Sequence, residues 1–378
     1  MKVYFDNAAT TPLDPEVFEA IKPFMLDFFG NPSSTHSHGR QVRSAIEQAR
    51  KTIAELLNTS PGEIFFTSGG TEADNTIIRS NVEAHGIKRI ISSPIEHHAV
   101  LHNVELLAKN KVIDVLEFVN LDNKGHIEMN HLEALLKEDT PTLVSLMHAN
   151  NEIGNLNDIE QIGELCDKYG AIFHSDTVQT MGHYQHDLSS LKINGLACGA
   201  HKFHGPKGSG FMYIRKDSKI HPLMIGGGQE RNMRGGTENV YGIIGTAKAL
   251  EIAYRDMAEH QQYIQSLKDR MIEKLKALNL SIAFNGDSEN AVKSLYTVLN
   301  VSLPASEKND MLLFTMDLNN ISVSGGSACN SGSHIGSHVL TALGADPNRG
   351  AIRLSFSKMN TIEEVDFVAN KIADFYKS

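Results

Sequence analysis

The stretch Gly199-Ala200-His201-Lys202-Phe203-His204-Gly205-Pro206-Lys207-Gly208-Ser209-Gly210 connects two apolar runs, residues 193–198 and 211–214. Both runs are typical of strands, so Lys202 is predicted to lie on a short connection punctuated by glycine and proline. Lysine forms Schiff bases when burial or a neighbouring charge keeps part of its amine neutral. Most lysines beside glycines are only solvated loop residues. Other residues of the chain are therefore needed to distinguish a Schiff-base lysine from a solvated one.

Strands and helices alternate on both sides of this stretch. Such alternation predicts an α/β fold with a mainly parallel sheet covered by helices on both faces. The predicted strands are residues 63–67, 89–93, 142–147 and 171–175, and helical spacing of apolar residues is found at 39–58, from 72 onward and at 159–166.

Polar side chains follow directly after the predicted strands. These are Thr71, His97, Asn151, Asp176 and Lys202. Ligands of parallel sheets bind beyond the carboxyl ends of the strands, so these five residues are expected to share one site. Each of them alone would also suit a turn or a helix cap.

Residues 68–71, Ser-Gly-Gly-Thr, form a turn between a predicted strand and a predicted helix. The free N–H groups and the positive end of the helix dipole at such a turn suit a phosphate. The turn lacks the lysine of a Walker loop and the spaced glycines of a dinucleotide fingerprint. An ordinary βα turn remains the alternative.

A Schiff-base lysine, a phosphate cradle and a carboxylate are together what pyridoxal phosphate requires of a protein. Lys202 would supply the amine, Asp176 the anion for the pyridine nitrogen, and Gly70 with Thr71 part of the cradle. The alternative for Asp176 is the N-cap of a helix that follows it.

Two further side chains suit the same cofactor. His97 could stack on its ring, and Gln179 could bond its ring hydroxyl.

Cys329 lies in a run of glycine, serine and alanine, residues 324–333, that is unsuited to a core. A cysteine in such a segment is expected to be exposed and able to reach a substrate, in contrast to Cys166 on an apolar helix face. A surface cysteine without a role is the alternative. Arg353, on a late strand, suits capture of a carboxylate, unless it is part of a surface ion pair.

The composition restricts the class of protein. The chain has 378 residues, a formal net charge of −10 and no dense block of lysine and arginine, which argues against nucleic acid and membranes as partners. No apolar run approaches the length of a membrane span, and the N-terminus does not resemble a signal peptide. Three scattered cysteines predict neither disulfides nor a metal site, and we expect a reducing, cytoplasmic location.

In these motifs the chain resembles the pyridoxal-phosphate-dependent cysteine desulfurases of the class V aminotransferase group, in the branch that serves iron–sulfur cluster assembly and nitrogenase maturation. The resemblance covers nearly the whole chain in order. The matching segments are residues 6–12, 67–72, 96–100, 147–154, 174–179, 201–208, 234–237 and 327–329.

The resemblance implies a fold and a role for each matching residue. The fold would be the type I fold of these enzymes, with a mainly parallel sheet of the seven-stranded type in a large domain, residues 14–257, and a smaller α/β domain from residues 1–13 and 258–378. Lys202 would hold the cofactor and move protons, His97 would stack on its ring and assist acid–base steps, and Cys329 would attack the sulfur of cysteine to leave alanine and a persulfide. Asp176 would contact the pyridine nitrogen, Gln179 the ring hydroxyl, and Gly70, Thr71 and His201 the phosphate. Thr237 would contact the phosphate from the other subunit of a homodimer. Asn151 and Arg353 would bind the carboxylate of L-cysteine. A sulfur acceptor protein is implied as a partner.

The chain departs from the family pattern at three places. Gly199 stands where a serine usually donates to the phosphate, which predicts weaker cofactor retention. Residues 334–336, His-Ile-Gly, replace the usual Leu-Glu-Pro, and the chain ends at Ser378 without a longer tail. The last two differences argue against docking on a scaffold protein.

Other functions remain open from the sequence. A cysteine or selenocysteine lyase on the same fold would release sulfide or selenide, and a plain aminotransferase would have no need of Cys329. A catalytically silent subunit of a sulfur-transfer complex is the non-enzymatic alternative, against which the presence of Lys202, Asp176 and Cys329 argues.

Overall fold

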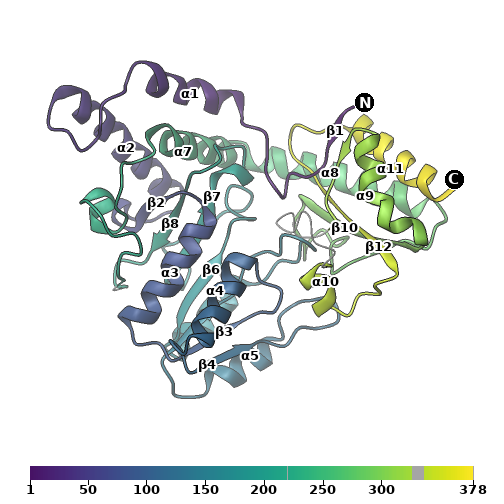
Figure 1. Cartoon of the computed structure of the whole chain (residues 1–378), viewed down its shortest axis with the longest axis horizontal. Coiled ribbons are helices and arrows are strands. Elements are labelled where there is room, and N and C mark those ends of the chain that lie inside the picture. The colour runs from purple at the N-terminus through teal and green to yellow at the C-terminus, as the bar shows by residue number, and fades with distance from the viewer. Residues whose placement is uncertain (219, 326–335, 378) are drawn as a thin grey trace.

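A seven-stranded sheet lies at the centre of the larger part of the molecule (Figure 1). The computed structural model describes residues 1–218, 220–325 and 336–377. All neighbouring strands are parallel except β8, which is antiparallel to both of its neighbours. The strand order is β2 (Ile64–Thr67), β8 (Gly210–Ile214), β7 (Gly195–Gly199), β6 (Ile172–Asp176), β5 (Thr142–Ser145), β3 (Arg89–Ser92) and β4 (Val115–Phe118). The prediction of a mainly parallel sheet is therefore confirmed.

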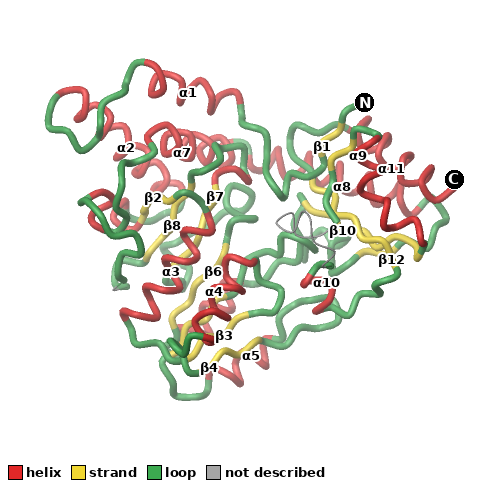
Figure 2. Tube along the Cα trace, in the orientation of Figure 1, coloured by secondary structure: helices red, strands yellow, loops and turns green. Residues whose placement is uncertain are grey.

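Helices cover both faces of this sheet, as the alternating pattern predicted. On one face α3 (Gly70–Ala84) and α4 (His98–Lys109) bury their apolar residues. The opposite face is covered by α1 (Pro15–Leu26), α2 (Ser37–Leu56), α5 (Met129–Leu136), α6 (Ile159–Lys168) and α7 (Val240–Arg255). Figure 2 shows the strands enclosed between these helices. The short strand β4 and helix α5 were not predicted.

The smaller part of the molecule has its own sheet and its own core. The antiparallel sheet is formed by β12 (Arg349–Ser355), β10 (Val298–Ala305) and β9 (Ala283–Phe284). It packs with α8 (Met257–Lys276), α9 (Leu312–Leu318) and α11 (Ile362–Lys377), while the short α10 (His338–Ala342) lies toward the larger part. Helices α7 and α8 follow each other directly and are separated at Asp256.

The N-terminal residues belong with the C-terminal part of the chain. Strand β1 (Val3–Tyr4) pairs in parallel with β11 (Ile321–Ser322), and Phe5 is fully buried against Phe356. Both termini lie on the same side of the molecule in Figure 1. The core of the larger part contains only residues between 17 and 252, and that of the smaller part contains residues 3, 5 and 264–375. On this basis we propose the domain division 14–257 and 1–13 with 258–378.

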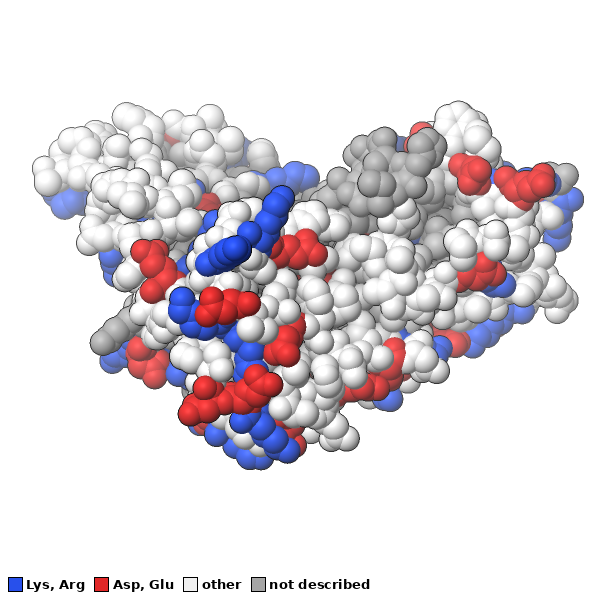
Figure 3. Space-filling view, turned by 60° about the horizontal axis from the view of Figure 1, so that its bottom comes forward, with Lys and Arg blue, Asp and Glu red and all other residues white. Residues whose placement is uncertain are grey.

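The surface carries charges of both signs. Figure 3 shows lysine and arginine side chains interspersed with aspartate and glutamate on the face that it displays. Within the described ranges, no helix combines the length and the apolar character that crossing a membrane requires.

A buried ion pair ties α2 to the Gly-rich loop between β8 and α7. Both guanidinium NH groups of Arg50 lie 2.8 Å from the carboxylate oxygens of Glu230, which also accepts the N–H of Phe66 at 2.8 Å. Glu230 and the next two residues all have positive φ, from 44° to 67°, which is strained for residues other than glycine. The ion pair therefore holds a strained loop in place.

We expect Glu230→Gln to lower the free energy of unfolding by about 3 kcal/mol, because it leaves the buried Arg50 without its full countercharge. Urea unfolding at pH 7 measures the change. Glu19→Gln is the matched control, since it breaks the exposed pair with Lys22 and should change stability by less than about 0.5 kcal/mol. Equal effects of the two substitutions would contradict this account of the loop.

Candidate active site

A cavity of about 270 Å³ lies at the carboxyl ends of the parallel strands. It brings together nine of the residues that the sequence predicted for one site. The lining consists of Ala8, Ala9, Gly70, Thr71, Asp74, His97, Met147, Ala149, Asn151, Asp176, Val178, Gln179, His201, Lys202 and Arg353.

Lys202 ends the short 3₁₀ helix η2 (Ala200–Lys202), which directly follows β7. Its Nζ donates to the backbone oxygens of Ala8 at 2.6 Å and Ala9 at 2.9 Å. Small residues at positions 8 and 9 allow this segment to pass close to the amine. The lysine that the sequence placed on a connection between strands is therefore partly buried and held at the cavity.

Asp176 is the last residue of β6 and is 7% exposed. Its Oδ1 accepts the N–H of Val178 at 2.9 Å, a turn contact rather than a helix cap. Burial raises the pKa of this carboxyl to about 6, although the Val178 N–H and the charge of Lys202 act to lower it. A bound cation would therefore stabilise the ionised form of this carboxyl group.

Two further buried carboxyls stand near Asp176. Burial, with the charge of Asp176, raises the pKa of Asp74 well above its usual value. The pKa of Glu96 is also raised by burial, against one hydrogen bond from the Met147 N–H. Asp74 was missed by the sequence reasoning, although it lies one helical turn after Gly70 and hence on the same face of α3. This spacing is the signal that could have found it.

The N-terminus of α3 opens into the same cavity. The first turn of a helix leaves its N–H groups without intrahelical partners, and the N-cap Gly69 contributes no side-chain cap. Glycine is required at position 70, because a Cβ there would lie 2.4 Å from Cγ2 of Val178. The turn at residues 68–71 is therefore shaped to present backbone N–H groups.

His201 lies close to this helix end. A Cβ added at Gly199 would be 3.5 Å from both the Gly70 nitrogen and the His201 ring, so these two groups are neighbours. The ring Nδ1 is 3.2 Å from the Thr10 hydroxyl. Burial, and then the charges of Lys202 and Lys207, lower the pKa of His201 to about 4, so the ring is neutral at pH 7.

His97 and Gln179 both line the cavity. His97 is the N-cap of α4, and its Nδ1 accepts the Ala99 N–H at 3.2 Å. Burial is the main reason why the pKa of His97 falls to about 4, with a smaller effect of the Lys202 charge. The ring is therefore neutral, with its proton on Nε2. The amide of Gln179 donates to the backbone oxygen of Ala8 at 3.0 Å.

Arg353 is buried on β12 and is not part of a surface ion pair. One NH group donates to the backbone oxygen of Asn151 at 2.9 Å, and the other pairs with Asp6 at 2.8 Å. Its Nε is buried without a partner in the described structure. The guanidinium thus places a buried positive charge in the lining of the cavity.

Two of the predicted residues remain to be placed. Thr237 is exposed on the Gly-rich loop. Cys329 lies outside the described residues. The other two cysteines, Cys166 and Cys198, are buried and free. Among the described residues, no group of histidine, cysteine, aspartate and glutamate side chains suits a metal ion.

Comparisons with known proteins agree with this geometry. The family described as aminotransferase class V matches residues 3–368. Cysteine desulfurase IscS of Dictyoglomus turgidum is 42% identical over 370 residues, which are 97% of this chain and 92% of that protein. Among solved structures, a NifS-like protein aligns over the full length of both chains with a TM-score of 0.91 and 38% identity. SspA in complex with cysteine aligns over 96% of this chain and 100% of its own, with a TM-score of 0.81 and 31% identity.

The raised pKa of Asp176 predicts how the stability of the ligand-free protein depends on pH. The folded protein binds this proton more tightly than the unfolded chain, in which an aspartate has a pKa of about 3.9. The free energy of unfolding should therefore fall as the pH rises from about 4 to about 6, by roughly 3 kcal/mol. We expect Asp176→Asn to stabilise the ligand-free protein by up to that amount at pH 8, and by less as the pH approaches 4.

Urea unfolding at pH 5 and pH 8 measures this effect. Asp122→Asn serves as a control of opposite sign. Burial would raise the pKa of Asp122, but bonds from the N–H groups of His126 and Lys124 outweigh it and lower the pKa. If Asp176→Asn destabilised the ligand-free protein at pH 8, the account of its charge would be wrong.

Proposed function

Because this chain belongs to the class V aminotransferase family, with cysteine desulfurases as relatives over nearly its whole length, we propose that it is itself a cysteine desulfurase. It converts L-cysteine and a protein thiol into L-alanine and a protein persulfide, and this reaction is balanced without an oxidant or a reductant. The sulfur then serves iron–sulfur cluster assembly or another sulfur carrier.

The observation that carries this proposal is the convergence of three groups on one cavity. The Lys202 amine, the Asp176 carboxylate and the N-terminus of α3 come from distant parts of the chain and line the same space. An amine, an anion and a cluster of N–H donors have complementary uses only for a ligand that carries an aldehyde, a basic nitrogen and a phosphate.

The residues present fit pyridoxal phosphate. Asp176 offers a carboxylate with raised pKa, which a protonated ring nitrogen would relieve. The uncapped first turn of α3 offers N–H donors to a dianion. We propose that Lys202 binds the aldehyde carbon, that Gly70, Thr71 and His201 bind the phosphate, and that Gln179 binds the ring hydroxyl. His97 is proposed to contact the ring.

When bound, pyridoxal phosphate supplies an electron sink that labilises the bonds at the α-carbon of an amino acid. The protein supplies the proton transfers. Lys202 is the amine closest to this chemistry, and His97 can donate through Nε2, because Nδ1 is engaged by the Ala99 N–H.

The carboxylate of the substrate is proposed to bind Arg353 and Asn151. Arg353 lines the cavity and is held in place by Asp6 and by the Asn151 backbone oxygen. A fixed guanidinium orients a carboxylate with little loss of side-chain entropy.

Cys329 is proposed as the sulfur-accepting thiol. Its thiolate attacks the sulfur of the substrate, the C–S bond breaks, and the electron pair of that bond is left on the carbon that a proton then converts into the methyl group of alanine. Cys166 and Cys198 are unsuited to this role, because burial raises the pKa of both thiols and the thiolate is the reactive form.

Exposed apolar side chains support a homodimer. They lie on α1 and the residues beside it, on the Gly-rich loop and in the first turn of α7. A hydrogen bond from Gln229 to Ser33 joins the Gly-rich loop to the loop after α1. The members are Leu13, Phe18, Met25, Leu26, Phe29, Leu223, Met224, Ile225 and Tyr241. Such patches mark protein interfaces. Thr237, on the same Gly-rich loop, is proposed to bind the phosphate of the partner subunit.

The proposed partners are L-cysteine, a second copy of this chain and a sulfur acceptor protein. The acidic net charge argues against nucleic acid and anionic membranes as partners. A reducing, cytoplasmic location is proposed, because it would keep the thiol of Cys329 reduced between turnovers.

The first test is product analysis with L-cysteine. We expect wild type to form alanine and a persulfide on Cys329. In Cys329→Ala the rate of alanine formation should fall at least about 100-fold, because removing a catalytic nucleophile typically lowers the rate by that factor or more. Cys166→Ala is the matched control and should retain the persulfide. Pyruvate and ammonia from wild type would instead identify a β-eliminating lyase.

The second test concerns Gly199. Its extended backbone, with φ −126° and ψ 114°, accepts any residue, and a Cβ would meet its neighbours at 3.5 Å, an ordinary contact. A hydroxyl at this place would lie beside the N-terminus of α3. We expect Gly199→Ser to bind pyridoxal phosphate about tenfold more tightly, through one added hydrogen bond to a charged group.

Titration of cofactor-stripped enzyme with pyridoxal phosphate, followed by absorbance, gives this affinity. Gly199→Ala adds the same Cβ without the hydroxyl and should leave the affinity close to that of wild type. An unchanged affinity of Gly199→Ser would show that the phosphate is not bound beside this residue.

A further inference from the structure

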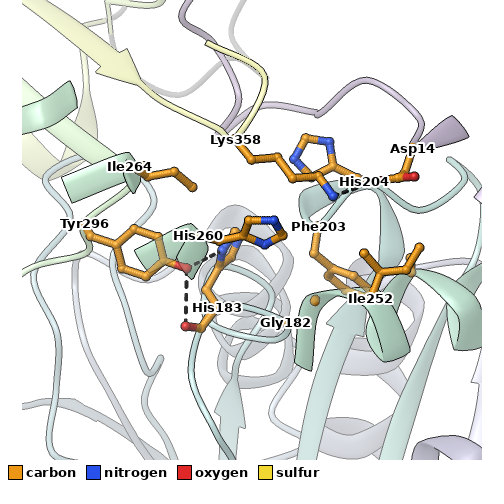
Figure 4. A pocket seen from close by; sticks show the side chains of 12 residues that line it. Asp14, Gly182, His183, Phe203, His204, Ile252, His260, Ile264, Tyr296 and Lys358 are labelled. Carbon is orange, nitrogen blue, oxygen red and sulfur yellow. Dashed lines mark hydrogen bonds and ion pairs between the residues drawn. The ribbon is translucent and has the colours of Figure 1, made fainter. Parts of the chain in front are cut away.

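A second, smaller cavity of about 20 Å³ lies behind Lys202. Figure 4 shows its lining side chains, which come from both parts of the molecule. Phe203 and His204 directly follow Lys202, whereas Tyr296 and Lys358 belong to the smaller part. The space is too small for a substrate, so the groups around it act mainly on one another.

His183 connects the two parts at this cavity. Its ring Nε2 lies 3.1 Å from the backbone oxygen of Lys202, and its Nδ1 lies 2.9 Å from the hydroxyl of Tyr296. Tyr296 is 5% exposed and belongs to the hydrophobic core of the smaller part. A side chain of the large part thus joins the backbone of the lysine to a residue of the smaller part.

The position of the ring proton follows from these partners. If the proton were on Nδ1, Nε2 would present a lone pair to the carbonyl oxygen of Lys202, and two acceptors would face each other at 3.1 Å. The proton is therefore on Nε2, and Tyr296 donates to Nδ1 rather than to the more distant backbone oxygen of His183 at 3.3 Å.

The ring is also neutral. Burial is the main reason why the pKa of His183 falls to about 4; the bond to the Lys202 oxygen opposes this shift, and the charge of His260 adds a smaller lowering effect. Burial raises the pKa of Tyr296, so its hydroxyl keeps the proton that it donates. Near neutral pH, Tyr296 therefore donates to His183, and His183 donates to the backbone oxygen of Lys202.

The peptide groups on either side of Lys202 are also hydrogen-bonded. Thr11 donates to the His201 oxygen through both its N–H and its hydroxyl, at 2.9 Å each. The same hydroxyl accepts the N–H of His204 at 2.8 Å. The peptide that follows the lysine is held at both ends, because its N–H, that of Phe203, donates to the Ala200 oxygen at 3.2 Å and its carbonyl oxygen lies 3.1 Å from Nε2 of His183.

We propose that His183 is a positioning residue for Lys202 and that Tyr296 acts through it. The Nε2–H of His183 orients the Lys202–Phe203 peptide and hence the direction of the lysine side chain, and Tyr296 fixes the tautomer that makes this possible. The inference rests on the proposed role of Lys202 as the cofactor-binding amine.

The variants Tyr296→Phe, His183→Leu and His183→Gln test this inference in the holoenzyme. Losing one hydrogen bond should raise the Kd for pyridoxal phosphate about three- to tenfold in Tyr296→Phe and in His183→Leu. Both variants should also have a lower kcat, whereas KM for cysteine should stay within about twofold of the wild-type value. His183→Gln, whose amide can donate in place of Nε2–H, should recover most of the loss. Tyr184→Phe is the control, since it removes a neighbouring hydroxyl and leaves the Tyr296–His183 bond intact.

A double variant separates positioning from general packing. Because Tyr296 acts through His183, Tyr296→Phe should change the Kd little further in the His183→Leu background. The pH midpoint of the visible absorbance of the Lys202-bound cofactor provides a readout independent of turnover, and it should move in both single variants by half a unit or more. The other titratable groups that act on Lys202, namely Asp176, His97 and His201, are unchanged in all variants.

The outcomes distinguish this inference from the proposed function. Unchanged Kd, kcat and absorbance midpoint in Tyr296→Phe and His183→Leu would overturn the positioning role, as would a loss confined to the melting temperature. Borohydride reduction of wild type followed by peptide mass analysis tests the premise. If Lys202 carries no reduced cofactor, the proposed function itself is wrong.

Discussion

The site depends on one segment, residues 6–14, which is fixed on both sides. Asp6 pairs with the buried Arg353 at 2.8 Å, and the Ala8 N–H donates to the Ser355 hydroxyl at 2.9 Å. On the other side the backbone oxygens of Ala8 and Ala9 accept from Lys202. The residues joined in this way are separated by more than 190 positions in the sequence, so the segment closes long loops whose entropy must be offset by these contacts. Without it, Arg353 would lose its counter-ion and the amine of Lys202 would lose two backbone acceptors.

The electrostatics of the cavity are unfavourable in the protein alone. Asp74, Glu96 and Asp176 are all nearly or fully buried, and burial raises the pKa of each. Lys202 is the cation that acts on Asp176. A buried carboxylate costs free energy unless a positive charge or protons compensate it. Part of the folding free energy is therefore used to maintain a site that a cationic ring nitrogen would stabilise, which is a general feature of binding sites whose groups are arranged before the ligand arrives.

Much of the fold and many of the site residues could be predicted from the sequence, for a physical reason. Parallel strands share one carboxyl edge, so polar residues at strand ends such as Asp176 and Lys202 must converge. The contacts of Ala8, Ala9, His183 and Tyr296 could not be predicted, because they join segments between which no sequence period or turn chemistry predicts proximity. Asp74 is an intermediate case, since it was not predicted although its helical spacing from Gly70 indicates that both residues lie on one face of α3. Thr237 and Cys329 remain predictions from family resemblance.

The position of the smaller part against the larger part and the orientation of Lys202 are physically linked. Tyr296 stands two residues before β10, and in the sheet Asn300 of β10 is directly opposite Arg353 of β12. The group proposed to bind the substrate carboxylate and the group that fixes the tautomer of His183 are therefore carried by one sheet. Because strands of a hydrogen-bonded sheet move together, a displacement of this sheet would change the position of Arg353 and the restraint on Lys202 at the same time. The sheet thus links the residue proposed to bind the substrate to the lysine proposed to bind the cofactor.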